Sequence, residues 1–229
     1  MKINFNKAWV ISKINFRHLK LTYIITAVLV LAGCSNLIQY RIVPTQGAYI
    51  DMANYLYAAV VLAAIFIPAL NFRKIMHLNG KKIDFYWGAL INYAILSAVV
   101  SFADIILFLI SKAIFGSRFP VVNLVEIFGW LSHGVAAAFF QQFFFLLFTA
   151  VFIHTLTTMQ TFWFGWVTDV LLIAIISVFI PIPPLRAALV WFFYMIIFNG
   201  NALVQILSCL ILSAAIYSLD LLVLHRKKI

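Results

Sequence analysis

Ionisable side chains inside apolar stretches are the residues of this sequence with the clearest chemical meaning. Six acidic residues occur in all, and Asp104, Asp169 and Asp220 lie within long apolar runs. A carboxylate in such a run is costly and is expected to face a polar partner or a water-filled path. Asp104 and Asp169 are therefore candidates for a transport pathway or for interhelical hydrogen bonds. Asp220 lies near the end of its run, where we expect pairing with the basic tail.

Two adjacent amides, Gln141 and Gln142, interrupt a phenylalanine-rich run at residues 136–148. Neighbouring residues on a helix point about 100° apart, so at most one of these amides can face a central path. Both join Asp104 and Asp169 as candidate pathway residues. The 23 phenylalanines would suit an apolar lining for an amphipathic cargo.

Residue patterns that support catalysis are missing from the sequence. An intramembrane metalloprotease needs a motif such as HExxH or paired glutamates, whereas the only glutamate is Glu126 and the five histidines are scattered. No GxSxG element supports serine catalysis. The two cysteines, Cys34 and Cys209, lie in separate apolar runs and predict neither a zinc site nor a disulfide framework. We therefore expect no enzyme activity, metal or cofactor in this chain.

Hydropathy predicts the elements that carry these side chains. The 229 residues are 66% hydrophobic and 10% charged, which leaves too few polar residues to cover a water-soluble surface. A bilayer core about 30 Å thick needs roughly 20 apolar residues per helix. Six runs approach this length: 22–40, 53–70, 85–111, 135–157, 162–180 and 202–224. The sequence thus predicts an all-α integral membrane protein with six transmembrane helices in a single domain, residues 1–229.

Two further segments are apolar but atypical. Residues 181–201 begin with three prolines and Arg186, which predicts an extracytoplasmic re-entrant or interfacial segment; a seventh span is the alternative. Residues 1–21 place Phe5, Trp9, Phe16 and Leu19 on one helical face beside basic residues, which is typical of an amphipathic helix on anionic lipid. A basic flank that merely orients the first span fits this pattern equally well.

The distribution of basic residues predicts the orientation in the membrane. Of the 16 lysines and arginines, five lie in residues 1–20, four in residues 73–82 and three in residues 226–228. The positive-inside rule therefore places both termini and the loop after the second span in the cytoplasm. The remaining four are Arg41, Lys112, Arg118 and Arg186. The net charge of +10 is explained without a nucleic-acid partner.

The stretch FRKIMHLNGKKIDFYWG at residues 72–88 is the most motif-like part of the chain. Asn79 and Gly80 mark a turn. Gly80 and Lys81 do not end a phosphate-binding loop, because Ile75 replaces its first glycine and Lys82 its Ser or Thr. We therefore expect no nucleotide site here. A basic loop that only orients the spans is the plain alternative.

This loop resembles the coupling region between the second and third spans of type-2 permeases of ATP-binding cassette exporters. In those proteins a short helix, a turn, a basic pair, an acidic residue and aromatics dock on the ATPase. Within residues 71–84, the coupling residues that the resemblance implies are Arg73, Lys74, His77, Leu78, Asn79, Gly80, Lys81, Lys82 and Asp84. The chain is similar to small bacterial permeases that export phenol-soluble modulins or confer lantibiotic immunity. Outside the loop the similarity is architectural: a basic elbow helix, six spans and a re-entrant piece before the last.

The resemblance implies a permease subunit of an exporter in the bacterial plasma membrane, moving an amphipathic or hydrophobic cargo such as peptides, with a role in resistance to antimicrobial peptides. It also implies cytosolic ATPase subunits that hold ATP and Mg, and a second permease, identical or paralogous. One alternative is an ion-coupled secondary transporter or channel that uses Asp104 and Asp169. Another is an immunity or scaffold protein that transports nothing.

Overall fold

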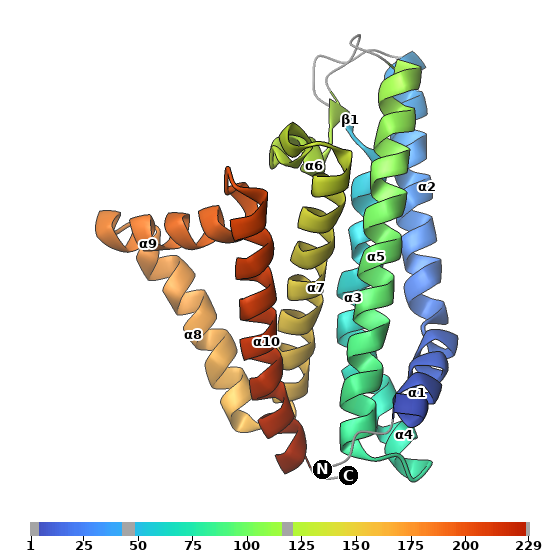
Figure 1. The fold of residues 1–229 in the computed structure, drawn as a ribbon, viewed down its shortest axis with the longest axis vertical. Helices are drawn as coiled ribbons and strands as arrows, with labels where there is room; N and C mark the ends of the chain where they lie inside the picture. The colour runs from blue at the N-terminus through green and yellow to red at the C-terminus, as the bar shows by residue number, and fades with distance from the viewer. Residues whose placement is uncertain (1–4, 43–48, 116–120, 228–229) are drawn as a thin grey trace.

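The computed structural model describes residues 5–42, 49–115 and 121–227, which form an elongated bundle of helices (Figure 1). The predicted all-α class is confirmed, since the strands within these ranges are only a parallel pair of two residues each, β1 (Tyr49–Ile50) and β2 (Val121–Val122). Three of the basic residues counted above, Lys2, Arg118 and Lys228, lie outside the described ranges.

The first part of the chain forms α1 (Phe5–His18) and α2 (Lys20–Ile42). After β1 come η1 (Met52–Leu56), α3 (Tyr57–Phe66), η2 (Ile67–Asn71) and α4 (Phe72–His77). These four pieces make one apolar helical stretch of 26 residues. Its η2 segment is a π-helical turn that contains Pro68, whose missing N–H favours such an irregularity.

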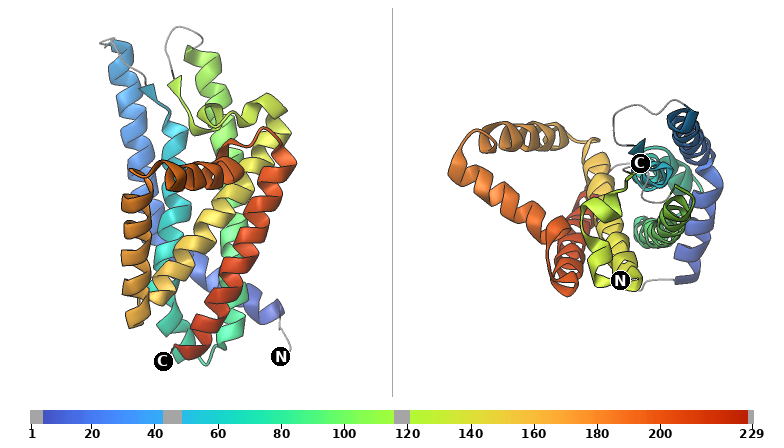
Figure 2. Two further views of the ribbon diagram at one scale, coloured as in Figure 1. Left: turned by 90° about the vertical axis from the view of Figure 1, so that its left-hand side faces the viewer. Right: turned by 90° about the horizontal axis from the view of Figure 1, so that it is seen from above.

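The rest of the chain begins with the 34-residue helix α5 (Lys82–Phe115). After β2 follow α6 (Leu124–Ile127), η4 (Trp130–His133), α7 (Val135–Met159) and α8 (Trp163–Phe179). The chain ends with α9 (Pro183–Phe193), η5 (Tyr194–Phe198) and α10 (Ala202–Arg226). In Figure 2, α8 and α9 splay away from the other helices.

Five helical stretches among the described residues are long and apolar enough to cross a membrane, so the chain is a multi-pass membrane protein. They are Lys20–Gln39, Met52–His77, Lys82–Ala113, Val135–Met159 and Ala202–Arg226. The helices at 163–179 and 183–198 are long and apolar enough to cross a membrane only when they are taken together. A bend of 117° lies between them. The number of spans is six if this bent pair is one span. The predicted re-entrant segment, 181–201, therefore contains the bend, α9 and η5.

The core is built around α7, which packs against α10, α5 and α3. Buried alanines on α3, including Ala63 and Ala64, let its backbone approach α7 closely. In contrast, Gly165 is the only buried residue of α8, and α9 has none. Helices α8 and α9 therefore expose apolar side chains on nearly every side.

The two ends of the bundle differ in charge. One end carries the start of α1, α4, the α4–α5 loop and the end of α10 (Figure 1). We call it the basic end, after Arg73, Lys74, Lys81, Lys82, Arg226 and Lys227. The far end carries β1, β2 and α6.

Hydrogen bonds join two connecting segments at the far end, and we call these bonds the clasp. The buried carboxylate of Asp51, just after β1, accepts hydrogen bonds from Asn123 Nδ2 at 3.1 Å and Ser111 Oγ at 3.3 Å. Asn54 Nδ2 donates to the Val122 carbonyl at 2.8 Å. These contacts and the β1–β2 pairing bind the start of the η1–α4 stretch to α5 and to the segment that follows it.

Candidate functional site

The α4–α5 loop has a defined turn that ends α4. Gly80 N donates to the Ile75 carbonyl at 3.0 Å, and Asn79 N donates to the Met76 carbonyl at 3.1 Å. This pair of bonds, with Asn79 at φ 58, is the Schellman arrangement of a helix C-terminus. A Cβ on Gly80 would lie 2.7 Å from the Ile75 carbonyl oxygen, so the position requires glycine. The Asn-Gly pair therefore fixes the loop in one conformation.

Most of the nine coupling residues inferred from sequence face outward. Six of them are exposed: Arg73, Lys74, His77, Leu78, Asn79 and Lys81. Leu78 is 71% exposed, which is unusual for an apolar side chain at the tip of a fixed turn. The loop thus presents one protruding leucine among basic side chains.

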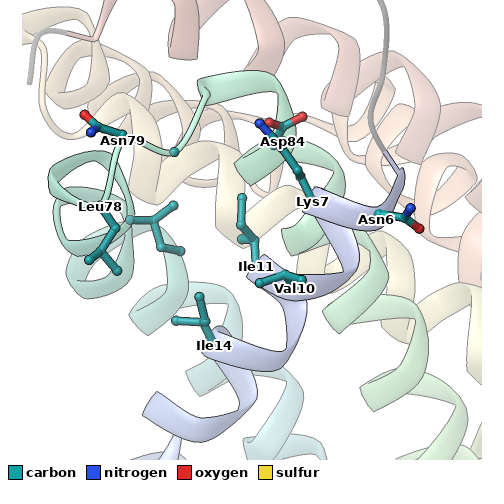
Figure 3. A pocket seen from close by; sticks show the side chains of 10 residues that line it. Asn6, Lys7, Val10, Ile11, Ile14, Leu78, Asn79 and Asp84 are labelled. Atoms are coloured by element: carbon teal, nitrogen blue, oxygen red, sulfur yellow. The ribbon is translucent and has the colours of Figure 1, made fainter.

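Lys82 and Asp84 face inward instead. Lys82 Nζ donates to the backbone carbonyls of His225 at 3.1 Å and Lys227 at 2.5 Å. These are carbonyls at the end of α10, where a cation is favoured by the helix dipole. Asp84 is 3% exposed, and Figure 3 shows its side chain and that of Lys7 pointing toward one another. Lys82 therefore holds the loop against the end of α10, and Asp84 lies buried beside α1.

A cavity of about 470 Å³ opens between α1 and this loop. Figure 3 shows Val10, Ile11 and Ile14 of α1 on one side and Leu78 on the other. The residues that line it are Asn6, Lys7, Val10, Ile11, Ile14, Ile75, Leu78, Asn79, Gly80 and Asp84. It is an apolar groove with a polar rim.

The face by which α1 packs differs from the predicted amphipathic face. Its buried residues are Ala8, Ile11, Ser12 and Asn15. Phe5 and Trp9 are 67% and 46% exposed, whereas Leu19, predicted on the same face, is 1% exposed. Phe5 and Trp9 remain available for lipid, and an interfacial elbow role for α1 stays a prediction.

Three buried amides fasten α1 to the bundle. Asn15 Nδ2 donates to Asn92 Oδ1 at 3.0 Å, and Asn71 Nδ2 donates to Asn15 Oδ1 at 3.2 Å. Asn92 Nδ2 in turn donates to the Ser12 carbonyl at 3.0 Å. Because Asn71 belongs to η2 and Asn92 to α5, these hydrogen bonds connect α1 to the helical stretches before and after the loop.

The predicted pathway residues divide into separate polar clusters. Asp104 Oδ2 accepts from Gln142 Nε2 at 2.8 Å and from Tyr57 Oη at 3.4 Å, which joins α5, α7 and α3. Asp104 is fully buried, and no hydrogen bond from the described residues reaches its Oδ1. Gln141 instead donates to Gln205 Oε1 on α10 at 2.6 Å. The adjacent amides therefore bind different helices.

Asp169 has its own partner near the start of α8. Its Oδ2 accepts from Gln160 Nε2 at 2.5 Å, and the residue is only half-buried. Asp104 and Asp169 thus have separate hydrogen-bond partners on separate helices. The structure gives no direct contact between them.

Sequence reasoning missed His154, which was one of the scattered histidines. Its Nδ1 lies 2.6 Å from Tyr93 Oη, and its Nε2 lies 3.3 Å from Asp220 Oδ2. Asp220 was expected to pair with the basic tail; its carboxylate instead lies against the His154 ring, and its electrostatic effect also reaches Lys227 of the tail. His154 and Asp220 each lie about five or six residues from the basic end of their helix. A search for ionisable residues at matching depth would have found the pair.

In the parts of the chain that the structure describes, no group of three or more His, Cys, Asp or Glu side chains lies close enough to hold a metal ion. No protein-family model matches this sequence, and neither the curated proteins nor the solved structures give a significant match. The features of the chain that bear on its function are therefore the geometry of the basic end and the buried polar clusters.

Proposed function

We propose that this chain is the six-span permease subunit of an ATP-binding cassette exporter, and that a separate cytosolic ATPase docks on the α4–α5 loop. The observation that carries the proposal is the fixed turn at Asn79 and Gly80, which presents an exposed Leu78 among exposed Arg73, Lys74 and Lys81. An apolar anchor within a charged rim is the usual anatomy of a protein interface. The positive rim selects an acidic groove on the ATPase.

The helices around the loop are suited to transmit movement. Helix α4 continues into α3 through η2, and α5 begins two residues after Gly80. A displacement of the loop would therefore move two membrane helices. Lys82 also bonds to the end of α10, so a third helix would follow. Such coupled shifts are a common means of switching access between two sides of a membrane.

The proposed topology places the basic end in the cytoplasm, with both termini there and α8 as the fifth span. At 17 residues, α8 is about 25 Å long, slightly short of a bilayer core, and the bend would set α9 at the far side as a re-entrant helix. Trp163 and Trp166 of α8 are 77% and 67% exposed. Lipid and a second permease, identical or paralogous, would cover these apolar faces. The proposed cargo is amphipathic or hydrophobic, such as a peptide.

The first test is copurification of the tagged chain from its native membranes in mild detergent. We expect an ATPase to copurify with the wild type and to be lost from Arg73→Glu/Lys74→Glu and from Leu78→Asp, because these changes reverse the rim charge or remove the anchor. Lys82 is avoided, since its contacts with α10 are structural.

The matched control is Lys13→Glu/Arg17→Glu, which reverses two charges on the exposed face of α1. The control should retain the ATPase, because these residues lie outside the docking surface. Loss of the ATPase from the control as well would mean that net charge, and not the loop, governs association. Purification of the wild type without any ATPase would contradict the proposal.

A second candidate is an ion-coupled transporter, and the burial of Asp104 favours it. A carboxylate with one oxygen free of hydrogen bonds, deep in a membrane domain, is a recurrent feature of proton and cation sites. Asp169, the second candidate pathway residue from the sequence, lies in the first half of α8 and is bonded to Gln160 instead. Transport that follows an imposed proton gradient in liposomes without ATP, and is lost in Asp104→Asn, would establish this function instead. A scaffold or immunity protein would protect cells even with an inactive ATPase.

A further inference from the structure

The groove between α1 and the α4–α5 loop is apolar at one end and polar at the other. Its buried lining residues Ile11 and Ile75 lie between the exposed Val10 on α1 and the exposed Leu78 on the loop. Figure 3 shows Asn79 and Asp84 at one end of the groove and Ile14 at the other. A ligand that fits the groove therefore has a polar part and an apolar part.

The polar end of the groove lies nearer the basic end of the bundle. Figure 1 shows α1 running from the basic end to its junction with α2. Asn6 and Lys7 belong to the first turn of α1, whereas Ile14 belongs to its second half. Helix α2, which follows, is the least buried of the five long spans. The apolar end of the groove thus points toward a helix that lipid surrounds, and the polar end points toward water.

The charge around the groove is positive. Residues 5–20 and 72–83 contain no acidic residue, and Asp84 at the rim is buried. The exposed lysines and arginines in these two segments are Lys7, Lys13, Arg17, Lys20, Arg73, Lys74 and Lys81. Such a concentration of one charge raises the local concentration of anions. The polar part of the ligand is therefore expected to be negative.

Two exposed aromatic side chains place α1 at the depth of lipid headgroups. Phe5 and Trp9 are exposed on the N-terminal half of α1, and the Lys13 ammonium lies 5.7 Å from the centre of the Trp9 ring. Aromatic rings beside basic side chains are typical of helices at the membrane surface. The groove next to them is therefore within reach of a lipid molecule.

The size of the groove favours a thin ligand. A helix with its side chains is about 10–12 Å across, so a single turn of it occupies roughly 400–600 Å³. The groove, at about 470 Å³, would hold no more than about one such turn. An acyl chain is a single row of methylene groups and can follow the groove along its length. A docked helix of a protein partner fits these dimensions less well.

We infer that the groove binds an anionic phospholipid from the leaflet at the basic end, with the phosphate at the polar rim and one acyl chain along Val10, Ile14 and Leu78. The acyl chain covers apolar side chains that would otherwise face water. The surrounding basic residues attract the headgroup. The lipid lies between α1 and the loop, beside the proposed docking surface. The inference needs no ATPase and holds for either orientation of the chain, since the basic end meets a membrane surface in both.

The test uses the purified full chain in nanodiscs of phosphatidylcholine with a small fraction of phosphatidylglycerol that carries a photoactivatable diazirine in one acyl chain. Trypsin releases the groove in fragments 8–13, 14–17 and 75–81, and the lipid-exposed α2 in fragment 21–41. We expect label on the groove fragments. Unlabelled phosphatidylglycerol should displace it roughly fivefold better than phosphatidylcholine or more, because each nearby basic residue favours anionic lipid by about that factor. On fragment 21–41 the two lipids should compete about equally.

Two matched variants locate the site. Val10→Trp fills the groove from an exposed position and should reduce the labelling of fragment 75–81 severalfold. Val28→Trp makes the same change on the exposed face of α2 and should leave that labelling unchanged.

Three outcomes would overturn the inference. Equal displacement of the groove label by both lipids would show ordinary contact with bulk lipid. Unchanged labelling in Val10→Trp would place the lipid elsewhere. Label on fragment 21–41 without label on the groove would leave a protein partner as the occupant. The nanodiscs contain no ATPase, so each of these outcomes is independent of the docking experiment.

Discussion

Asp104 shows how a single buried carboxylate can join three helices. Its Oδ2 accepts bonds from Gln142 and Tyr57, and these two residues also contact each other at 2.8 Å. Hydropathy identified Asp104 and Gln142, because a polar residue stands out within an apolar run. It could not identify Tyr57 as the third member, since a tyrosine near the start of a span fits lipid anchoring equally well.

Removing one partner of this cluster should lower the free energy of unfolding more than removing two partners. Gln142→Leu leaves the carboxylate of Asp104 short of its closest donor, and we expect a loss of about 1–3 kcal/mol in the free energy of unfolding. The double variant Gln142→Leu/Asp104→Leu should recover part of that loss, because the unpaired carboxylate is gone and only the Tyr57 hydroxyl loses its partners. Thermal unfolding in detergent measures both. A double variant less stable than the single one would show that the cluster adds net stability.

The same substitutions separate structure from transport. If Asp104 serves only as an interhelical contact, the stable double variant retains transport of the proposed cargo. If Asp104 belongs to the pathway, that variant folds but transports nothing. The two readouts together assign the role that sequence left open.

Helix α1 illustrates how element packing departs from a hydrophobic pattern. The pattern favoured Phe5, Trp9, Phe16 and Leu19 as one face, while the packed face consists largely of small and amide side chains. In a membrane protein, lipid is as apolar as the core, so hydrophobicity reports insertion and does not report which face meets another helix. The close approach to α5 depends instead on Gly88, where a Cβ would lie 2.9 Å from the Ala8 carbonyl oxygen.

Gly88→Ala should therefore loosen α1 without removing any side-chain contact. The added methyl group forces Ala8 and Ile11 away, and we expect a cost of about 1–3 kcal/mol from this overpacking. Trypsin should cleave after Lys13 and Arg17 several times faster than in the wild type. Gly200→Ala is the matched control, because only the Tyr194 hydroxyl, at 4.0 Å, comes near its Cβ. Equal cleavage rates for both variants would mean that α1 is held by other contacts.

At the scale of the whole molecule, the long spans were predictable and the bent pair only in part. The apolar runs of 18 to 27 residues all contain helices, because a polar backbone in lipid must bond to itself. The three prolines after residue 180 indicated a break. The bend of 117° between the helices on either side was not predictable, since packing sets the direction of a helix and α8 has few packed neighbours.

Cysteine labelling from either side of the membrane tests the number of crossings. In a chain with Cys34→Ala and Cys209→Ala, the proposed topology predicts that Lys81→Cys and Thr161→Cys react only from the cytoplasm and Gly200→Cys only from outside, because the proposed fifth span, α8, lies between the last two. A membrane-impermeant maleimide applied to intact cells and to inverted vesicles gives the readout. Labelling of positions 161 and 200 from one side would show that α8 and α9 enter and leave the membrane on the same face.

The clasp at Asp51 has a mechanical consequence. It fastens the start of the η1–α4 stretch to α5 at the far end, while the α4–α5 loop and the hydrogen bonds of Asn15 with Asn71 and Asn92 join the same two helices near the basic end. Two rods joined at both ends cannot spread apart and move as one rigid lever. A push on the loop should therefore swing the pair as a unit past its neighbours.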